Sequence, residues 1–239
     1  MTRSVLVVGA GGIAAPFGWA IARSGAALSL LVVDDDEVDV TNLHRQVLFG
    51  PADVGRPKLV ALREKLEALS SALTVRTLSS RVLPDNAVSL ASEVDLVVDA
   101  SDNFATRFLV ADACAIAGRP CVHAAAVRWQ ATVLAVGVAG RPCYRCLFED
   151  LPAGPAPDCA TAGVVGPVCG VAGAIAADLA LRSLRGDPTA TGAVFTYDGL
   201  RDRLRRVAVR PRADCALCGQ SPAIRSIDAS RYDADACSL

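Results

Sequence analysis

Two pairs of cysteines have the spacing of a metal site. Cys143 and Cys146 form one Cys-x-x-Cys motif, and Cys215 and Cys218 form a second one much later in the chain. Each motif offers two thiolates on one tight turn, and two such turns complete the tetrahedral set of four sulfur ligands that suits zinc. A redox-active pair is the alternative, but no thioredoxin-like context surrounds either motif. We therefore expect a structural Zn²⁺, since four sulfur ligands leave no open position for a substrate.

A glycine-rich turn near the N-terminus has the spacing of a nucleotide site. The apolar run 4–8 leads into the turn at 9–12, and a helical pattern follows. Gly9 and Gly11 permit a tight turn and let backbone N–H groups approach a phosphate at the helix N-terminus. Asp34 ends the next apolar run, about 20 residues further on, where such folds place a carboxylate on ribose hydroxyls. The pairing predicts a nucleotide without specifying which one, and NAD is the commonest ligand of this turn.

Two polar stretches follow predicted strands. Residues 34–46 combine an acidic cluster with amide and arginine side chains, and Lys58 comes at the start of the next helix. Fixed cations offset the charge that moves when nucleotide phosphates react, although the stretch alone is more typical of a solvated charged loop. Asp102 lies at the carboxyl end of the fourth strand, where open parallel sheets bind ligands. It is a candidate Mg²⁺ ligand, or a cap of the helix that begins at Asn103.

The apolar pattern predicts the elements that must position these side chains. The expected strands are 4–8, 28–34, 74–78, 94–99 and 120–125, separated by helices at 13–24, 57–69, 85–91 and 103–117. This alternation is typical of an α/β, Rossmann-like, doubly wound and mainly parallel sheet. Strands at 132–138, 193–197 and 205–209 predict an antiparallel C-terminal extension, with one long apolar helix over 168–184.

Length and composition limit the possible classes of protein. The 239 residues fit one large domain at 1–219, with a nucleotide-binding part at about 1–125, an antiparallel and zinc-bearing part at about 126–219, and a polar, mobile tail at 220–239. A net charge of −1 gives no electrostatic reason to bind nucleic acid or an anionic membrane. No cationic leader precedes the first strand, and the glycines within 160–177 argue against a transmembrane helix. We expect a cytoplasmic protein.

The other cysteines and the two histidines are less informative. Cys114, Cys121 and Cys169 lie in apolar runs, so we expect them to be small core residues. His44 and His123 are too isolated in the sequence to suggest a metal site or a triad, and His123 is expected to be a satisfied strand residue.

Together these motifs resemble the ThiF/MoeB/HesA family, the bacterial relatives of the ubiquitin-activating enzymes. The motifs are the turn at 9–12, the stretch 34–46, the run 55–58, Asp99-x-x-Asp102-Asn103, both Cys-x-x-Cys pairs and the run 158–167, in the family's order over about residues 5 to 219. The resemblance implies ATP in place of NAD. It also implies an adenylyltransferase that acts on the C-terminal Gly-Gly of a small β-grasp sulfur-carrier protein.

The resemblance implies a role for individual residues. Asp34 would hold the ribose, Arg45 and Lys58 the phosphates, and Asp102 the Mg²⁺. The implied nucleotide-binding set is Gly9, Gly11, Gly12, Asp34, Asp36, Asn42, Arg45, Gln46, Lys58, Asp102 and Asn103. No general base is needed for adenylation, because the attacking carboxylate is already ionised and the protein has only to align it and neutralise the leaving pyrophosphate.

The resemblance extends to a thiol and to partners. Cys159 matches the cysteine through which ThiF-like members link covalently to the carrier, and an inert loop cysteine is the alternative. The family implies a homodimer, a carrier docked on the antiparallel extension, and an external sulfur donor of the cysteine desulfurase or rhodanese type. Relatives usually carry an N-terminal helix whose arginine reaches the ATP site of the other subunit. This sequence begins at the first strand, so we expect that arginine to be missing or replaced.

Two other classes of function remain open from the sequence. One is an NAD-linked oxidoreductase, which the acidic stretch and the cysteine motifs disfavour. The other is a catalytically silent partner or scaffold protein of the same fold. Thiamine, molybdopterin and specialised-metabolite pathways cannot be distinguished from one chain.

Overall fold

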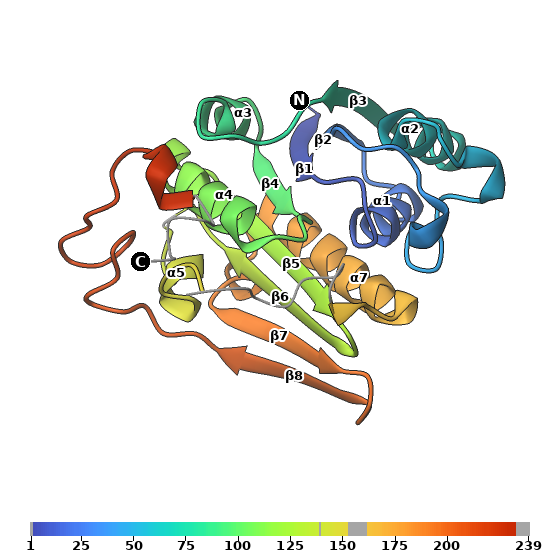
Figure 1. Ribbon diagram of the computed structural model, residues 1–239. Helices are drawn as coiled ribbons and strands as arrows, with labels where there is room; N and C mark the ends of the chain where they lie inside the picture. Colours follow the sequence, from blue (N-terminus) through green and yellow to red (C-terminus); the bar gives the residue numbers. More distant parts are fainter. Residues whose placement is uncertain (1, 139, 153–161, 233–239) are drawn as a thin grey trace.

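One eight-stranded mixed sheet organises the protein (Figure 1). The computed structural model describes residues 2–138, 140–152 and 162–232. The strands are β1 (Arg3–Val8), β2 (Leu28–Asp34), β3 (Leu73–Ser79), β4 (Leu96–Asp99), β5 (Cys121–Val127), β6 (Gln130–Val136), β7 (Ala193–Asp198) and β8 (Arg203–Ala208). The helices are α1 (Ala14–Arg23), α2 (Lys58–Leu69), α3 (Ala87–Ser92), α4 (Phe104–Ala117), α5 (Tyr144–Leu147) and α7 (Gly166–Leu184). Short 3₁₀ turns are η1 (Val40–Asn42), η2 (Pro51–Asp53), η3 (Pro188–Ala190) and η4 (Ala229–Tyr232).

The sheet changes from parallel to antiparallel at β5. Its order is β3-β2-β1-β4-β5-β6-β7-β8. The first five strands in this order pair in parallel, whereas β5 with β6, β6 with β7, and β7 with β8 pair antiparallel. The parallel strands are separated along the chain by helices, while β5 and β6 are joined directly by a tight turn that fits only antiparallel neighbours. The expected fold class, with its antiparallel C-terminal extension, is confirmed.

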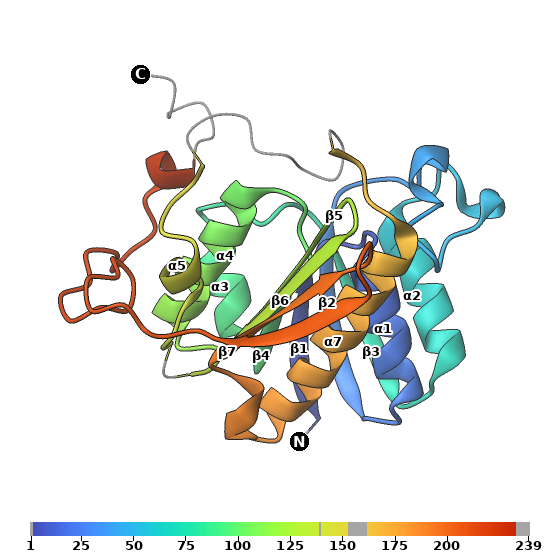
Figure 2. The same ribbon diagram turned by 90° about the horizontal axis from the view of Figure 1, so that it is seen from below.

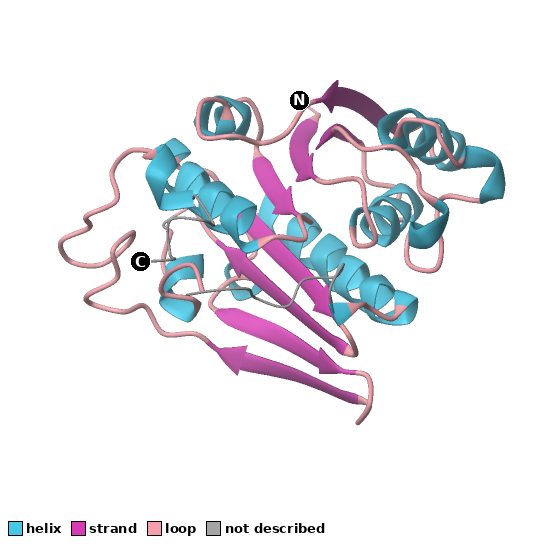
Figure 3. Ribbon diagram, viewed as in Figure 1, coloured by secondary structure: helices cyan, strands magenta, loops and turns pink. Residues whose placement is uncertain are grey.

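Helices cover both faces of the sheet, as Figures 2 and 3 show. Because side chains alternate along a strand, Val5 and Val7 of β1 pack on the side of α1, α2 and α7. Leu6 and Val8 pack on the opposite side, with α3, α4 and α5. The continuous apolar runs of the parallel strands thus serve two separate cores.

Helix α7 is the central helix of the first core. Among the described residues it is the one helix long and apolar enough to cross a membrane. Its residues Ala172, Ala176 and Leu179 are fully buried, and the helix lies along α1 and against β5 and β6 (Figure 2). The helix is therefore a core element, as the sequence predicted.

The described part of the C-terminal segment is packed against the domain. Ile224 and Tyr232 are buried, the Ile224 N–H donates to the carbonyl of Ala216 at 2.9 Å, and the Tyr232 hydroxyl donates to Asp112 at 2.8 Å. The expectation of a mobile tail from residue 220 is wrong for residues 220–232. The side chains of Ile224 and Tyr232 pack in the second core and hold this segment against the domain.

Candidate functional site

The carboxyl ends of β1, β2 and β4 surround a cavity. All the expected nucleotide-binding residues except Asn103 line this cavity. Those that line it are Gly9, Gly11, Gly12, Asp34, Asp36, Asn42, Arg45, Gln46, Lys58 and Asp102. Residues that lie far apart in the sequence meet there because parallel strands end at the same edge of the sheet.

The glycine turn forms the floor of this cavity. Gly9 has φ of +91°, a conformation that residues with a Cβ rarely adopt, and a Cβ there would lie 3.2 Å from the carbonyl oxygen of Ala100. The next N–H, of Ala10, donates to Asp34 Oδ2 at 2.7 Å. The turn is thereby held against the end of β2.

Asp34 is fixed by two backbone groups. Oδ2 accepts from Ala10, and Oδ1 accepts from the N–H of Asp36 at 2.8 Å. Burial raises the pKa of Asp34, and the two N–H hydrogen bonds oppose that rise. Each carboxylate oxygen keeps a lone pair with which it can accept a hydroxyl group of a ligand.

Two cations face the cavity. Lys58, at the start of α2, is buried, and its Nζ lies 2.7 Å from Oδ2 of the exposed Asp36. Arg45 donates to the side-chain oxygen of Asn42 and, at 3.4 Å, to the carbonyl of Thr41. Both cations are held by weak or exposed partners, so an anionic ligand can compete for them.

The stretch that carries Arg45 folds around the cavity. Asp39 caps η1 by accepting the Thr41 N–H at 2.7 Å, and Val38 and Phe49 anchor the stretch in the first core. Gln46 is buried, and its Oε1 has no hydrogen-bond partner among the described residues. A buried acceptor without a donor is costly, and a ligand hydroxyl or amino group would satisfy it.

Asp102 and Asn103 have different surroundings. The Asn103 side chain accepts the Thr106 N–H at 2.8 Å and is the N-cap of α4, so it does not line the cavity. The alternative that Asp102 caps this helix is therefore wrong. Asp102 is exposed on the cavity wall, and among the described residues its carboxylate makes no hydrogen bond or ion pair.

Sequence reasoning missed several residues of the cavity, among them an arginine and a cysteine. Arg107, on the first turn of α4, is buried there and donates to the carbonyls of Ala124, at 3.1 Å, and Ser101. Its signal in the sequence was a cation within an otherwise apolar helix. Cys169 is buried as expected, but it also lines the cavity beside Gly12, and only the approach of α7 to the turn reveals this.

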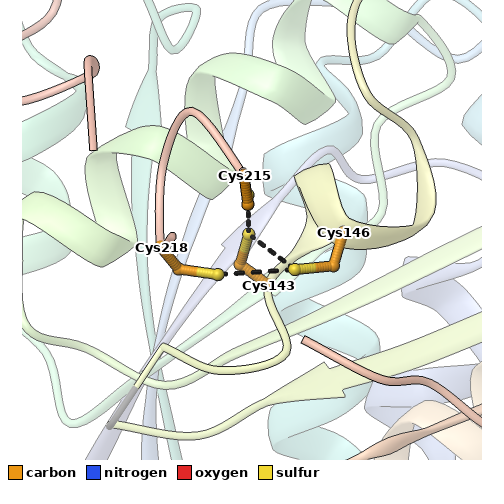
Figure 4. A group of neighbouring side chains, drawn as sticks. All are labelled: Cys143, Cys146, Cys215 and Cys218. Atoms are coloured by element: carbon orange, nitrogen blue, oxygen red, sulfur yellow. Dashed lines mark hydrogen bonds between the residues drawn. The ribbon is translucent and has the colours of Figure 1, made fainter. Parts of the chain in front are cut away.

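The four cysteines of the two motifs converge, although 72 residues separate each first-motif cysteine from its counterpart in the second (Figure 4). The Sγ atoms of Cys143 and Cys215 are 3.5 Å apart, those of Cys146 and Cys218 are 3.4 Å apart, and those within the first motif are 3.9 Å apart. Ligands about 2.3 Å from zinc in a tetrahedron lie about 3.8 Å from one another. The cluster thus has the donor set and the size of a tetrahedral metal site.

A buried ion pair fixes the first motif to α4. Arg145 lies between the two cysteines of that motif and makes a bidentate contact with Asp112, at 2.8 and 2.9 Å. Its guanidinium also stacks 4.7 Å from the ring centroid of Phe108, and Tyr232 completes the set by donating to Asp112. Hydrogen bonds of this kind keep a buried pair charged.

The remaining cysteines divide into two groups. Cys114 and Cys121 are buried in the second core, as expected. Cys159 lies outside the described residues, so its predicted role stays a prediction.

The fold and the cavity define a class of protein. An open α/β sheet with a glycine turn, a fixed carboxylate and buried cations at the carboxyl ends of its strands is a nucleotide-binding α/β domain. The ThiF family profile matches residues 1–217, and the chain belongs to the ThiF family.

Curated relatives agree with this assignment. The chain is 40% identical to the sulfur carrier protein adenylyltransferase of Thermus thermophilus, over 94% of this chain and 85% of that protein. It is 40% identical to the adenylyltransferase and sulfurtransferase MOCS3 of Sus scrofa, over 95% of this chain and 50% of that one. The chain thus spans about half the length of MOCS3.

Solved structures share the fold. A structure of Escherichia coli MccB with MccA-N7isoASN matches with a TM-score of 0.80 and 22% identity, covering 91% of this chain and 67% of that one. A structure of PaaA matches with a TM-score of 0.71 and 19% identity, covering 87% and 64%.

Proposed function

We propose that the protein is an ATP-dependent adenylyltransferase that activates the C-terminal Gly-Gly carboxylate of a small β-grasp sulfur-carrier protein. The observation that carries the proposal is the meeting of the glycine turn, Asp34, Arg45 and Lys58 in one cavity. The relative from Thermus thermophilus, whose name states this activity, supports the choice of substrate.

The residues suit such a reaction without a general base. The carrier carboxylate attacks the α-phosphorus of ATP, the bond to pyrophosphate breaks, and an acyl-adenylate remains. Gly9, Gly11 and Gly12 would bring backbone N–H groups to the phosphates. Arg45 and Lys58 would neutralise the leaving pyrophosphate, each by exchanging a carboxylate or amide partner for phosphate oxygens.

Other side chains would bind the rest of the nucleotide. In this assignment Asp34 accepts ribose hydroxyls, and Gln46 offers its unsatisfied Oε1 to a donor of the nucleoside. Asp36 and Asn42 hold the cations in place until ATP arrives. Asn103 would contribute only by capping α4, at whose N-terminus Asp102 lies.

Two metal ions belong to the proposal. Asp102, with an exposed carboxylate that is not engaged in an ion pair in the described part of the chain, suits Mg²⁺ at the cavity wall, and that ion would supply further charge neutralisation at the phosphates. Zn²⁺ would occupy the four-cysteine cluster and join α5 and its N-cap residue to the segment after β8. Its closed set of sulfur ligands assigns it a structural role.

The protein's surroundings complete the proposal. Residues 1–219 would act as one adenylation domain, in the cytoplasm and as a homodimer, with the carrier docked on the antiparallel strands. An external donor of the cysteine desulfurase or rhodanese type would deliver sulfur, and Cys159 would form the covalent link to the carrier.

Isotope exchange between pyrophosphate and ATP tests the adenylation step. The substrate is a β-grasp protein that ends in Gly-Gly, taken from the same genome, and the matched control is that protein without its last glycine. We expect exchange with the complete tail only. Exchange that ignores the carrier, or no exchange with any such carrier, would contradict the proposal and favour a silent partner protein.

A further inference from the structure

A second cavity adjoins the nucleotide cavity. It has a volume of about 200 Å³, and Asp102 and Arg107 line both cavities, so they mark the junction. Beyond the junction its walls are mostly apolar and include Leu134, Tyr144 and Phe148. In a nucleotide bound with its α-phosphate at this junction, a group attached to that phosphate would lie beside the second cavity.

His123, which is paired with a buried aspartate, forms part of the wall of this second cavity. His123 of β5 is 3% exposed, and its Nδ1 lies 2.9 Å from Oδ2 of the fully buried Asp99. The other carboxylate oxygen of Asp99 accepts the N–H of Ser101 at 3.1 Å and its hydroxyl at 2.6 Å. Burial opposes the ionisation of Asp99. The hydrogen bond from His123 and the charge of Arg107 outweigh burial, and the pKa of Asp99 is lowered.

These contacts determine which nitrogen of His123 carries the proton. An ionised carboxylate only accepts hydrogen bonds, so Nδ1 carries a proton, and in the neutral form of the ring Nε2 has a free lone pair. Nε2 is buried and has no hydrogen-bond partner among the described residues. The sequence-based expectation of a satisfied strand histidine is therefore wrong for this nitrogen.

Polar and aromatic groups from β4, α4 and α5 surround the ring. Asp99 faces it from β4, Arg107 lies next to it on α4, and the Tyr144 ring of α5 has its centroid 4.6 Å away. A neutral thiol is a poor nucleophile, so a thiol that attacks in this cavity needs a base to take its proton.

We propose that Nε2 of His123 is the general base of an acyl-transfer step, which follows adenylation and in which a thiol in the second cavity attacks the acyl-adenylate at the junction. The step rests on the proposed function for its acyl-adenylate. The sulfur forms a bond to the carbonyl carbon, the bond from that carbon to the phosphate oxygen breaks, and AMP leaves with the electron pair. The thiol proton moves to Nε2 and then to solvent, and no oxidant or reductant is consumed.

The arrangement matches what this chemistry requires. A carboxylate on Nδ1 holds the neutral ring in the tautomer that accepts a proton at Nε2, and it stabilises the imidazolium that forms. A histidine with only a structural role would use both nitrogens in hydrogen bonds, because an unsatisfied buried nitrogen destabilises the fold. Arg107 at the junction places a positive charge where the carbonyl oxygen becomes negative.

The test starts after adenylation. N-acetyl-Gly-Gly adenylate is supplied as a synthetic mixed anhydride with 2-mercaptoethanol as the thiol, and thioester formation is followed by chromatography. We expect the wild-type protein to accelerate this reaction. His123→Gln should lose about 10²–10⁴-fold of the rate, and Asp99→Asn should lose a similar factor because it reverses the tautomer. The matched control is Cys121→Ala, on the same face of β5 and outside the cavity, which should keep the rate.

Two further readouts separate catalysis from folding. The pH dependence of the rate should differ between the wild-type protein and His123→Gln, and the residual rate of His123→Gln should follow only the ionisation of 2-mercaptoethanol. Imidazole added to His123→Ala should restore the rate in a saturable way, which it cannot do for a residue that only supports the fold. An unchanged rate and pH profile in His123→Gln, or the absence of imidazole rescue, would overturn the proposal.

Carrier-dependent pyrophosphate exchange in the same proteins measures adenylation separately. If the protein shows rapid, His123-dependent thiolysis but no such exchange, the proposed function is refuted and the role of His123 stands. Exchange without any acceleration of thiolysis by the wild-type protein would refute the role of His123 alone.

Discussion

The crossing of α1 and α7 predicts opposite effects for the same substitution at two glycines of one helix. At Gly173 an added Cβ would lie 2.7 Å from Cγ of Pro16, and 2.8 Å from both the carbonyl oxygen of Ile13 and the backbone nitrogen of Phe17. Two of these atoms are backbone and cannot rotate away, so the two helices must separate. At Gly170, one turn earlier in α7, an added Cβ would meet no heavy atom of the described residues within 4 Å apart from the backbone of its own helix.

The magnitudes follow from these distances. Overpacking of this kind lowers the unfolding free energy by about 1–3 kcal/mol, whereas replacing a helical glycine with alanine raises it by about 0.5–1 kcal/mol. Gly173→Ala should therefore lose about 0.5–2 kcal/mol of unfolding free energy, or about 1–8 °C in Tm. Gly170→Ala should gain about 0.5–1 kcal/mol, or about 1–4 °C.

Thermal unfolding followed by circular dichroism measures both variants under identical conditions. Ile13 also lines the nucleotide cavity, so the displacement of α1 in Gly173→Ala should weaken ATP binding in calorimetry, and Gly170→Ala should bind as the wild type does. If Gly173→Ala were as stable as Gly170→Ala and bound ATP equally well, the close approach of the helices would be refuted.

Three further substitutions test the site and its support. Lys58→Ala should lower carrier-dependent pyrophosphate exchange about 10²–10³-fold, because a cation that contacts the phosphates is lost. The matched control is Lys65→Ala on the same helix, which should leave the exchange unchanged because Lys65 pairs with Asp53 outside the cavity. Equal effects of the two substitutions would contradict the assignment. Cys143→Ser should reduce the zinc content below one per chain in mass spectrometry and lower Tm, and a wild-type protein without zinc would remove the metal proposal. Asp112→Ala should cost about 3–5 kcal/mol in urea unfolding, because Arg145 stays buried and keeps only the exposed Asp150 as a carboxylate partner. Adding Arg145→Met should recover most of the loss, and a double variant no more stable than the single one would contradict this.

The elements of this fold could be predicted from sequence because their signals are local. The parallel strands are continuous apolar runs, and β2 is observed at the predicted 28–34. Gly118 ends α4 in the left-handed conformation, as a C-terminal glycine does. Within each cysteine motif the spacing already places two thiols on one turn, and the expected cluster of four is observed.

Contacts between distant segments could not be predicted in this way. Arg107 and Cys169 reach the cavity only because α4 and α7 approach it from opposite faces of the sheet. The Tyr232 contact with Asp112 depends on the path of the chain after the second cysteine motif, which carries no periodic pattern.

The sequence by itself therefore determined the kind of protein: an α/β sheet, a nucleotide turn and two Cys-x-x-Cys pairs, each encoded by residues close together in the chain. The tertiary structure alone decided which buried polar groups meet. Asp99 and His123 are ordinary strand residues in the sequence, and they become a pair only because β4 and β5 lie side by side in one register. The physical reason is that a side chain's protonation and its free lone pairs depend on the atoms around it, and in this core those atoms come from distant parts of the chain.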